Sequence, residues 1–123
     1  FTGIPGSSNW YGFGFITYSN KAKLKILGVT KDTLIEEGAV SEKVVKEMAE
    51  GALRNSGSDF TISISGIAGP TGGTDDKPVG TVCFGIGSQD NINCFTEYFK
   101  GDREEVRKQS VAFALKELLK CLQ

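Results

Sequence analysis

The chain has 123 residues, 14 of them basic and 15 acidic, and its formal net charge at pH 7 is -1. This length is enough for one domain with a buried core, and the charge lacks the basic excess of a nucleic-acid-binding protein. No apolar run approaches the ~20 residues of a membrane-spanning helix, and the first ten residues lack the charged and apolar regions of a signal peptide. We therefore expect a cytoplasmic protein with neither a nucleic acid nor a membrane as partner.

The chain contains three cysteines and no histidine. Cys83, Cys94 and Cys121 lie far apart without the paired spacing of a zinc site, so we expect free thiols. Without histidine, no Ser-His-Asp or Cys-His couple can form, and the commonest transition-metal ligand is missing. Acid-base chemistry must then use Lys, Tyr, Asp, Glu or Cys, and we expect neither a metal nor a cofactor.

The first half of the chain predicts a loop, a strand and three helical segments. Residues 4–12 are expected to form a loop with at most one helical turn, capped by Ser7 or Ser8. Residues 13–19, "FGFITYS", predict a strand because they are aromatic and β-branched. Residues 21–28 predict a short helix that ends at Gly28, and residues 31–38 predict another turn or two. Residues 41–57 predict an amphipathic helix with one apolar face, formed by Val44, Val45, Met48, Ala52 and Leu53.

The second half predicts three strands and a helix. Residues 59–66 and 79–87 are expected as strands on either side of a glycine-rich loop, and residues 91–101 as a third strand that forms a hairpin with the second. Asp102 begins the last helix, and Glu105 completes a capping box. The buried side of this helix is predicted to be Val106, Phe113, Leu115, Leu118, Leu119 and Leu122. Because strands and helices interleave, the fold class is α/β, with helices covering a mixed sheet.

The loop "SGIAGPTGGTDDKPVGT", residues 65–81, contains more glycine than a reversal of direction requires. It does not match a P-loop, because Thr74 and Asp75 follow Gly73, and it does not match the dinucleotide fingerprint, because no helix follows. Loops after a strand are a usual ligand site in α/β domains, so bare amides here could hold an anion; a flexible connection is the alternative. Asp75 and Asp76 suit solvated charges better than metal ligands.

A second candidate site consists of Ser8, Tyr18 and Lys23. Without histidine, a serine nucleophile needs another base, and an amine held neutral can take that role. Lys23 falls near the first turn of a helix, where the helix dipole and the charges of Lys21 and Lys25 lower its pKa. The alternative is structural: Ser8 as a helix cap, Tyr18 as the polar end of a strand and Lys23 as a solvated charge.

The stretches "PGSS", "TYSNKAKLKILGV", "GAVSEKVV", "EMAEGA", "SGIAGPTGGTDDKPVGTV" and "GDREEVRKQ" together resemble the CinA C-terminal domain family, which includes bacterial nicotinamide-nucleotide amidases. The resemblance runs from about Ile4 to Leu119. It implies a three-layer α/β/α sandwich around a mixed β-sheet, found in homo-oligomers. It also implies hydrolysis of the carboxamide of nicotinamide mononucleotide to nicotinate mononucleotide and ammonia, in pyridine-nucleotide salvage, with this small-molecule nucleotide as substrate.

The resemblance further implies roles for individual residues. Ser8 would attack the amide carbon, Lys23 would accept the proton and later assist the departure of ammonia, and Tyr18 would relay protons or orient Lys23. The nucleotide pocket would be lined by the glycine-rich loop, through Gly66, Ala68, Gly69, Pro70, Thr71, Gly72 and Gly73.

One departure from the family pattern concerns the start of the chain. Family members normally carry a further helical segment before this point, with a Glu-Ser-Cys-Thr-Gly-Gly stretch near the ligand. We therefore expect residues 1–123 to form a CinA C-terminal-like amidase domain without that part. The alternative is a non-catalytic nucleotide-binding or regulatory module of the same family.

Overall fold

The structure is a computed structural model that describes all 123 residues. It contains one short 3-10 helix, four α-helices and three β-strands. In chain order these are η1 (Ser7–Asn9), α1 (Asn20–Leu27), α2 (Lys31–Glu37), α3 (Glu42–Ser56), β1 (Thr61–Gly66), β2 (Thr81–Gly87), β3 (Ile92–Tyr98) and α4 (Arg103–Cys121). No helix combines the length and the apolarity that are needed to cross a bilayer.

The sheet has the order β1-β2-β3, and both pairs of neighbours are antiparallel. Ser63 of β1 lies opposite Gly85 of β2, which lies opposite Cys94 of β3. All seven residues of β2 are buried. The predicted hairpin of the last two strands is confirmed, but the expected mixed sheet is wrong in this chain, because every pairing is antiparallel.

The strand that we predicted over residues 13–19 is not part of the sheet. Residues 12–18, which we call the extended arm, form no helix and pair with no strand. A strand is stabilised by the hydrogen bonds of a neighbour, and the local sequence of the arm cannot supply one. The aromatic and β-branched residues therefore predicted an extended backbone but not its pairing.

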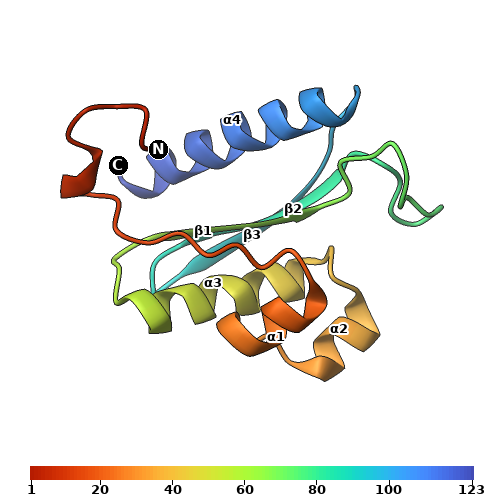
Figure 1. The fold of residues 1–123 in the computed structure, drawn as a ribbon, viewed down its shortest axis with the longest axis horizontal. Helices are drawn as coiled ribbons and strands as arrows, with labels where there is room; N and C mark the ends of the chain where they lie inside the picture. Colours follow the sequence, from red (N-terminus) through yellow and green to blue (C-terminus); the bar gives the residue numbers. More distant parts are fainter.

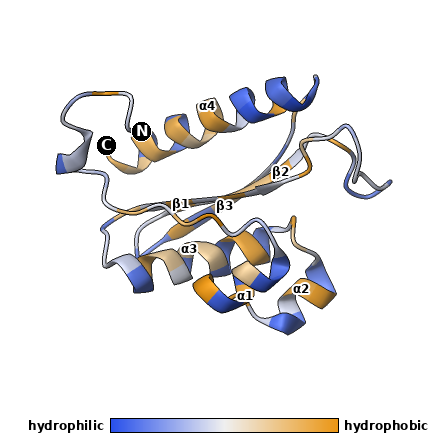
Figure 2. Ribbon diagram, in the orientation of Figure 1, coloured by the Kyte–Doolittle hydropathy of each residue, from blue (hydrophilic) through white to orange (hydrophobic).

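The helices cover both faces of the sheet: α1, α2 and α3 lie on one side and α4 lies on the other (Figure 1). Two apolar clusters follow from this arrangement. One joins α1 and α3 to Cys83 of β2, and the other joins Phe84 and Ile86 of β2 to α4. In Figure 2 the carboxyl-terminal half of α4 and much of α1 are hydrophobic, whereas the start of α4 and the tip of the loop between β1 and β2 are hydrophilic.

Side-chain caps begin the four α-helices as the sequence suggests. The hydroxyl of Ser19 accepts a hydrogen bond from the Ala22 amide at 3.1 Å, and Asp102 and Glu105 form the predicted capping box. Thr30 and Ser41 cap α2 and α3 in the same way. The prediction for η1 is wrong: Gly6, with a φ of 87°, occupies its N-cap position, and no side chain caps it.

The buried face of α4 differs from the predicted one. Val106, Ser110 and Ala114 are buried, whereas Leu115 and Leu119 are exposed. Residues spaced by four lie on one side of a helix, so the stripe through Val106 faces β2 and the later leucines turn away from it. Leu122, also predicted to be buried, is exposed, while Phe113 and Leu118 pack at the edge of the cluster.

The residues before the arm pack mainly on one another through aromatic rings. Phe1 stacks on Tyr11 with ring centroids 4.9 Å apart, and it meets the edge of Trp10 at 6.0 Å. These contacts tie the amino terminus to the residues that follow η1, and both chain termini lie at this end of the molecule (Figure 1).

Helices α1 and α3 approach closely at Gly51. A Cβ atom at this position would collide with the backbone carbonyl of Leu27. We predict that Gly51→Ala lowers the free energy of unfolding by about 1–3 kcal/mol, the usual cost of overpacking, although alanine favours helix. Urea denaturation measures this, with the exposed neighbour Glu50→Ala as control. Equal free energies of unfolding for the two variants would show that α1 and α3 can move apart without a loss of stability.

Candidate active site

Lys23 is a buried lysine in a chain with few buried charges, with 6% of its surface exposed. Its ammonium donates a hydrogen bond of 2.7 Å to the carbonyl of Thr17 and a longer one of 3.4 Å to the carbonyl of Tyr18. No carboxylate forms an ion pair with it, since the two salt bridges of the chain lie on α4. Lys23 is thus held in place by neutral oxygens alone.

Burial lowers the pKa of Lys23 from its ordinary value. Removal from water disfavours the ammonium, and no neighbouring carboxylate compensates. Burial is the resolved cause of this shift, so the expected contribution of the charges of Lys21 and Lys25 is not seen. A lysine whose pKa is lowered in this way supplies a larger fraction of neutral amine near neutral pH, which is the form that acts as a base.

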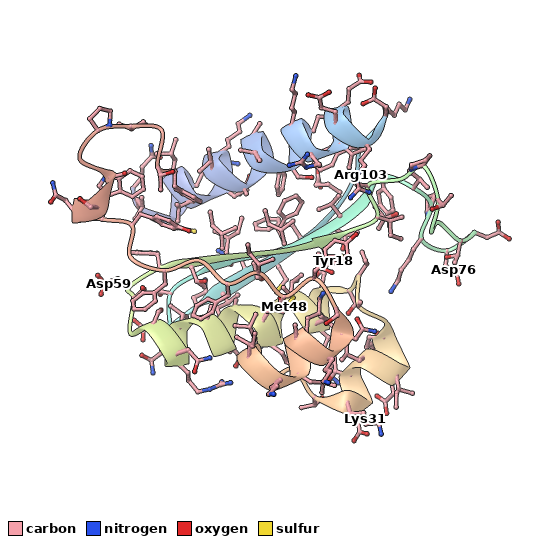
Figure 3. All side chains as sticks on the ribbon, viewed as in Figure 1. Tyr18, Lys31, Met48, Asp59, Asp76 and Arg103 are labelled. Atoms are coloured by element: carbon pink, nitrogen blue, oxygen red, sulfur yellow. The ribbon has the colours of Figure 1, made fainter.

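Tyr18 lies five residues before Lys23 in the chain, and its side chain is turned to solvent. The residue is 87% exposed, and its contact with Lys23 is made through its backbone carbonyl. Figure 3 shows Tyr18 toward the same end of the sheet as Arg103, with Asp59 at the opposite end. The phenol is therefore available to a ligand, while the backbone positions the amine.

Ser8 does not lie with the other two residues. It is exposed on η1, at the end of the molecule that holds both chain termini, whereas α1 and Lys23 lie beyond the far end of the extended arm (Figure 1). An extended chain advances about 3.3 Å per residue, so the arm alone separates them by roughly 20 Å. Within one chain, the structure brings Tyr18 and Lys23 together and leaves Ser8 apart.

A cavity of ≈ 1340 Å³ runs along the arm and reaches Lys23 and Tyr18. The arm and β1 line it, together with residues of α3 and α4. More than half of its lining residues, 21 of 37, are hydrophobic. The amine of Lys23, whose pKa is lowered, therefore lies on the wall of a large cavity. Functional groups with shifted pKa values are commonly found in such places.

The glycine-rich loop meets this cavity only at its base. Gly66 and Ala68 line the cavity, whereas the residues from Pro70 to Gly73 do not. Those residues are exposed and project from the body of the molecule toward Asp76, which Figure 3 labels at the outer end of the loop. Lys77 donates to the carbonyl of Glu37 at 2.6 Å, which ties the loop to α2.

Arg103 is a candidate that the sequence analysis missed. It lines the cavity, donates a hydrogen bond of 2.9 Å to the carbonyl of Gly69 and has no carboxylate partner. The sequence did hold a signal, because a cation in the first turn of a helix opposes the helix dipole and calls for another reason. Arg107, one turn further along α4, lines the same cavity.

The remaining titratable groups form no second centre. No group of three or more Cys, Asp or Glu residues is arranged to hold a metal ion. The three cysteines are free thiols, as predicted, and burial raises the pKa of Cys83 and Cys94. A raised pKa keeps a thiol protonated and inert, so these residues are poor nucleophiles.

Comparison with known proteins assigns the chain to a family. The model of the CinA C-terminal domain matches residues 1–122. The chain belongs to this family. The resemblance that the motifs suggested is therefore confirmed over almost the whole chain.

Individual members of the CinA C-terminal domain family are closely similar. The chain is 52% identical to the nicotinamide-nucleotide amidohydrolase PncC of Escherichia coli K12 over 118 residues, which are 95% of this chain and 72% of that protein. It is equally similar to PncC of Enterobacter agglomerans, over 97% of this chain and 73% of that protein. The crystal structure of the competence/damage inducible protein CihA from Agrobacterium tumefaciens superposes with a TM-score of 0.93 at 40% identity, covering 98% of this chain and 74% of that one.

The burial of Lys23 makes stability depend on pH. The pKa of Lys23 is lower in the folded chain than in the unfolded chain, where it is near 10.4. Between these two values the unfolded chain binds more protons, so stability rises with pH. We predict that the free energy of unfolding of the wild type, relative to Lys23→Met, increases between pH 7 and pH 10.

Urea denaturation at pH 7, 8.5 and 10 measures this difference. The variant Lys21→Met is the control, because Lys21 is an exposed lysine on the same helix. A difference that stays constant with pH, or that falls as the pH rises, contradicts a lowered pKa for Lys23.

Proposed function

We propose that this chain is a nicotinamide-nucleotide amidohydrolase, which converts nicotinamide mononucleotide and water to nicotinate mononucleotide and ammonia. The 52% identity to proteins named for this activity supports the proposal, and the chain covers 72–73% of their length. The observation that carries it within the structure is Lys23, a buried amine without a carboxylate partner on the wall of a large cavity. In a chain without histidine, a neutral amine of this kind can act as the base of amide hydrolysis.

The proposed reaction uses Lys23 to move one proton in each direction. The neutral amine takes a proton from an attacking hydroxyl as that oxygen bonds to the carboxamide carbon. When the carbon–nitrogen bond breaks, Lys23 returns the proton to the leaving nitrogen, which departs as ammonia. A water molecule then attacks the acyl intermediate with the same base and releases the carboxylate. Tyr18 borders the cavity beside the amine and is positioned to orient the carboxamide.

The remaining group of the proposed mechanism is the hydroxyl that attacks the carboxamide carbon. The resemblance assigns it to Ser8, but Ser8 lies at the other end of the arm from Lys23. A Ser8–Lys23 pair therefore requires a second copy of the chain or a large movement of the arm. We propose Lys23 as the general base. We expect the hydroxyl that it activates to reach the cavity from a position other than the one that Ser8 occupies in this structure.

The role of Lys23 is tested by ammonia release. We predict that Lys23→Met lowers kcat for nicotinamide mononucleotide at least 100-fold, the usual scale for losing a general base, with little change in binding. The exposed Lys25→Met is the matched control and should stay close to wild type. Wild-type turnover in Lys23→Met removes the lysine from the mechanism.

Ser8→Ala belongs in the same assay. We expect it to keep turnover within a few-fold of wild type, because Ser8 is distant from Lys23 in the structure. A loss as large as that of Lys23→Met would show that Ser8 reaches Lys23 in the working state, as the resemblance implies.

The separation of Ser8 from Lys23 also favours a second candidate, a nucleotide-binding or regulatory module without turnover. Calorimetric titration with nicotinamide mononucleotide, run beside the ammonia assay, separates the two functions. Binding without ammonia release favours the module, and binding with release that depends on Lys23 favours the amidase.

We propose that Arg103 contacts the phosphate of the substrate. An exposed guanidinium without a carboxylate partner, at the rim of the cavity, is suited to a phosphate. Arg103→Gln should weaken binding of nicotinamide mononucleotide about tenfold and leave binding of its dephosphorylated nucleoside nearly unchanged. Lys108→Gln is the control, because Lys108 is an exposed cation of α4 that does not line the cavity. Equal losses for both ligands would assign Arg103 to the loop that it holds and not to the phosphate.

A further inference from the structure

The hydrogen bonds of Lys23 fit a neutral amine better than an ammonium. Its Nζ atom has two partners in the chain, the carbonyl of Thr17 at 2.7 Å and the carbonyl of Tyr18 at 3.4 Å. An ammonium has three donors, whereas a neutral amine has two donors and one lone pair. The two carbonyls therefore accept from both donors of the neutral form, and no group of the chain uses its lone pair.

The position of Lys23 separates it from the other lysines of the chain. It is the only lysine that lines the cavity of ≈ 1340 Å³, and the only one that is buried. An exposed lysine with a pKa near 10.4 is neutral in only about one molecule in a thousand near pH 7. Burial lowers the pKa of Lys23, which raises this share, and a desolvated lysine of this kind is a nucleophile as well as a base.

The same cavity holds groups that suit an anion and an aromatic ring. Arg103 and Arg107 of α4 line it, and neither forms an ion pair. Arg103 gives one of its five donors to the carbonyl of Gly69, so others remain for a ligand. It lies toward the same end of the sheet as Tyr18 (Figure 3), whose carbonyl contacts the amine. Because 21 of the 37 lining residues are hydrophobic, a flat apolar ring also suits this cavity.

We propose that Lys23 is a covalent binding site for aromatic aldehydes that carry a phosphate, with Arg103 as the partner of the phosphate. The lone pair of Nζ bonds to the aldehyde carbon, and the aldehyde oxygen takes up a proton to give a carbinolamine. That oxygen then leaves as water. The two protons of the amine account for the two protons of this water, so the products are one imine and one water, and no oxidant or reductant is needed.

The imine has a consequence for turnover, which rests on the proposed amidase function. The same Nζ atom cannot accept a proton from an attacking hydroxyl while it is bonded to the aldehyde carbon. Phosphate-bearing aldehydes should therefore stop ammonia release, and hydrolysis of the imine should restore it. Formation of the imine itself does not depend on amidase activity.

Pyridoxal 5′-phosphate is a suitable probe, because it combines a pyridine ring, an aldehyde and a phosphate. The wild-type chain is incubated with an equimolar amount near pH 7 and reduced with borohydride, and the labelled residue is located by digestion and mass spectrometry. We expect Lys23 to react at least tenfold faster than any other amine of the chain, because a larger fraction of it is neutral. The exposed Lys25, on the same helix, is the internal control.

A variant tests the role of Arg103 separately. Arg103→Gln should slow the labelling of Lys23 by pyridoxal 5′-phosphate about tenfold and leave its labelling by pyridoxal, which lacks the phosphate, nearly unchanged. Lys108→Gln, which removes an exposed cation outside the cavity, should label like the wild type with both aldehydes.

Three results would overturn the proposal. They are label spread over the exposed lysines; an unlabelled Lys23; and an equal effect of Arg103→Gln on both aldehydes, which would mean that Arg103 acts by holding the loop at Gly69. Rapid label on Lys23 in a chain that releases no ammonia from nicotinamide mononucleotide would support the covalent site and count against the proposed amidase.

Discussion

The burial of β2 along its whole length is the constraint on which the rest of the structure depends. Its seven residues pair with a strand on each side and carry an apolar cluster on each face. Gly85 lies one residue past the centre of β2, where any side chain would strike the carbonyl of Val45 on α3. Ser63, opposite Gly85, donates a hydrogen bond of 2.6 Å to that same carbonyl. The sheet and α3 are therefore fixed to each other through backbone and hydroxyl contacts as well as through apolar packing.

A short series of contacts connects α3 to Lys23, the candidate base, and fixes the position of its amine. Gly51 lets α3 touch the backbone of α1 at Leu27, and Lys23 lies one turn before Leu27 on the same helix. The ammonium of Lys23 in turn holds the end of the arm through Thr17. The packing of the core, the position of the amine and the conformation of the arm therefore depend on one another. A change at the contact of α1 with α3 alters the candidate site.

Local sequence predicted most of the elements, because local chemistry determines them. Ser19, Asp102 and Gly28 define helix ends through their own hydrogen bonds and backbone angles, and these features are visible in the sequence. The hairpin of β2 and β3 follows from a short polar turn. The pairing of residues 13–19 was not predictable in this way, since it depends on what lies beside them in space.

The candidate site likewise has some features that the local sequence predicts and others that depend on neighbours in space. A lysine at the start of a short helix indicated a base of lowered pKa, but burial, which the sequence does not show directly, is the cause. The shared cavity of Lys23, Tyr18 and Arg103 depends on how the arm, β1 and α4 come together. The distance of Ser8 from Lys23 is likewise set by the extended backbone between them. A separation of fifteen residues in the sequence is compatible both with contact and with a large distance.

The aromatic contacts at the amino-terminal end have a consequence for spectroscopy. Trp10 is the single tryptophan of the chain, it is more than half exposed, and it lines the cavity two residues before the arm begins. The emission of an indole shifts to shorter wavelength when water leaves its surroundings. The tryptophan emission of the unlabelled protein therefore comes from one residue that lines the cavity, and its wavelength reports how much water surrounds that residue.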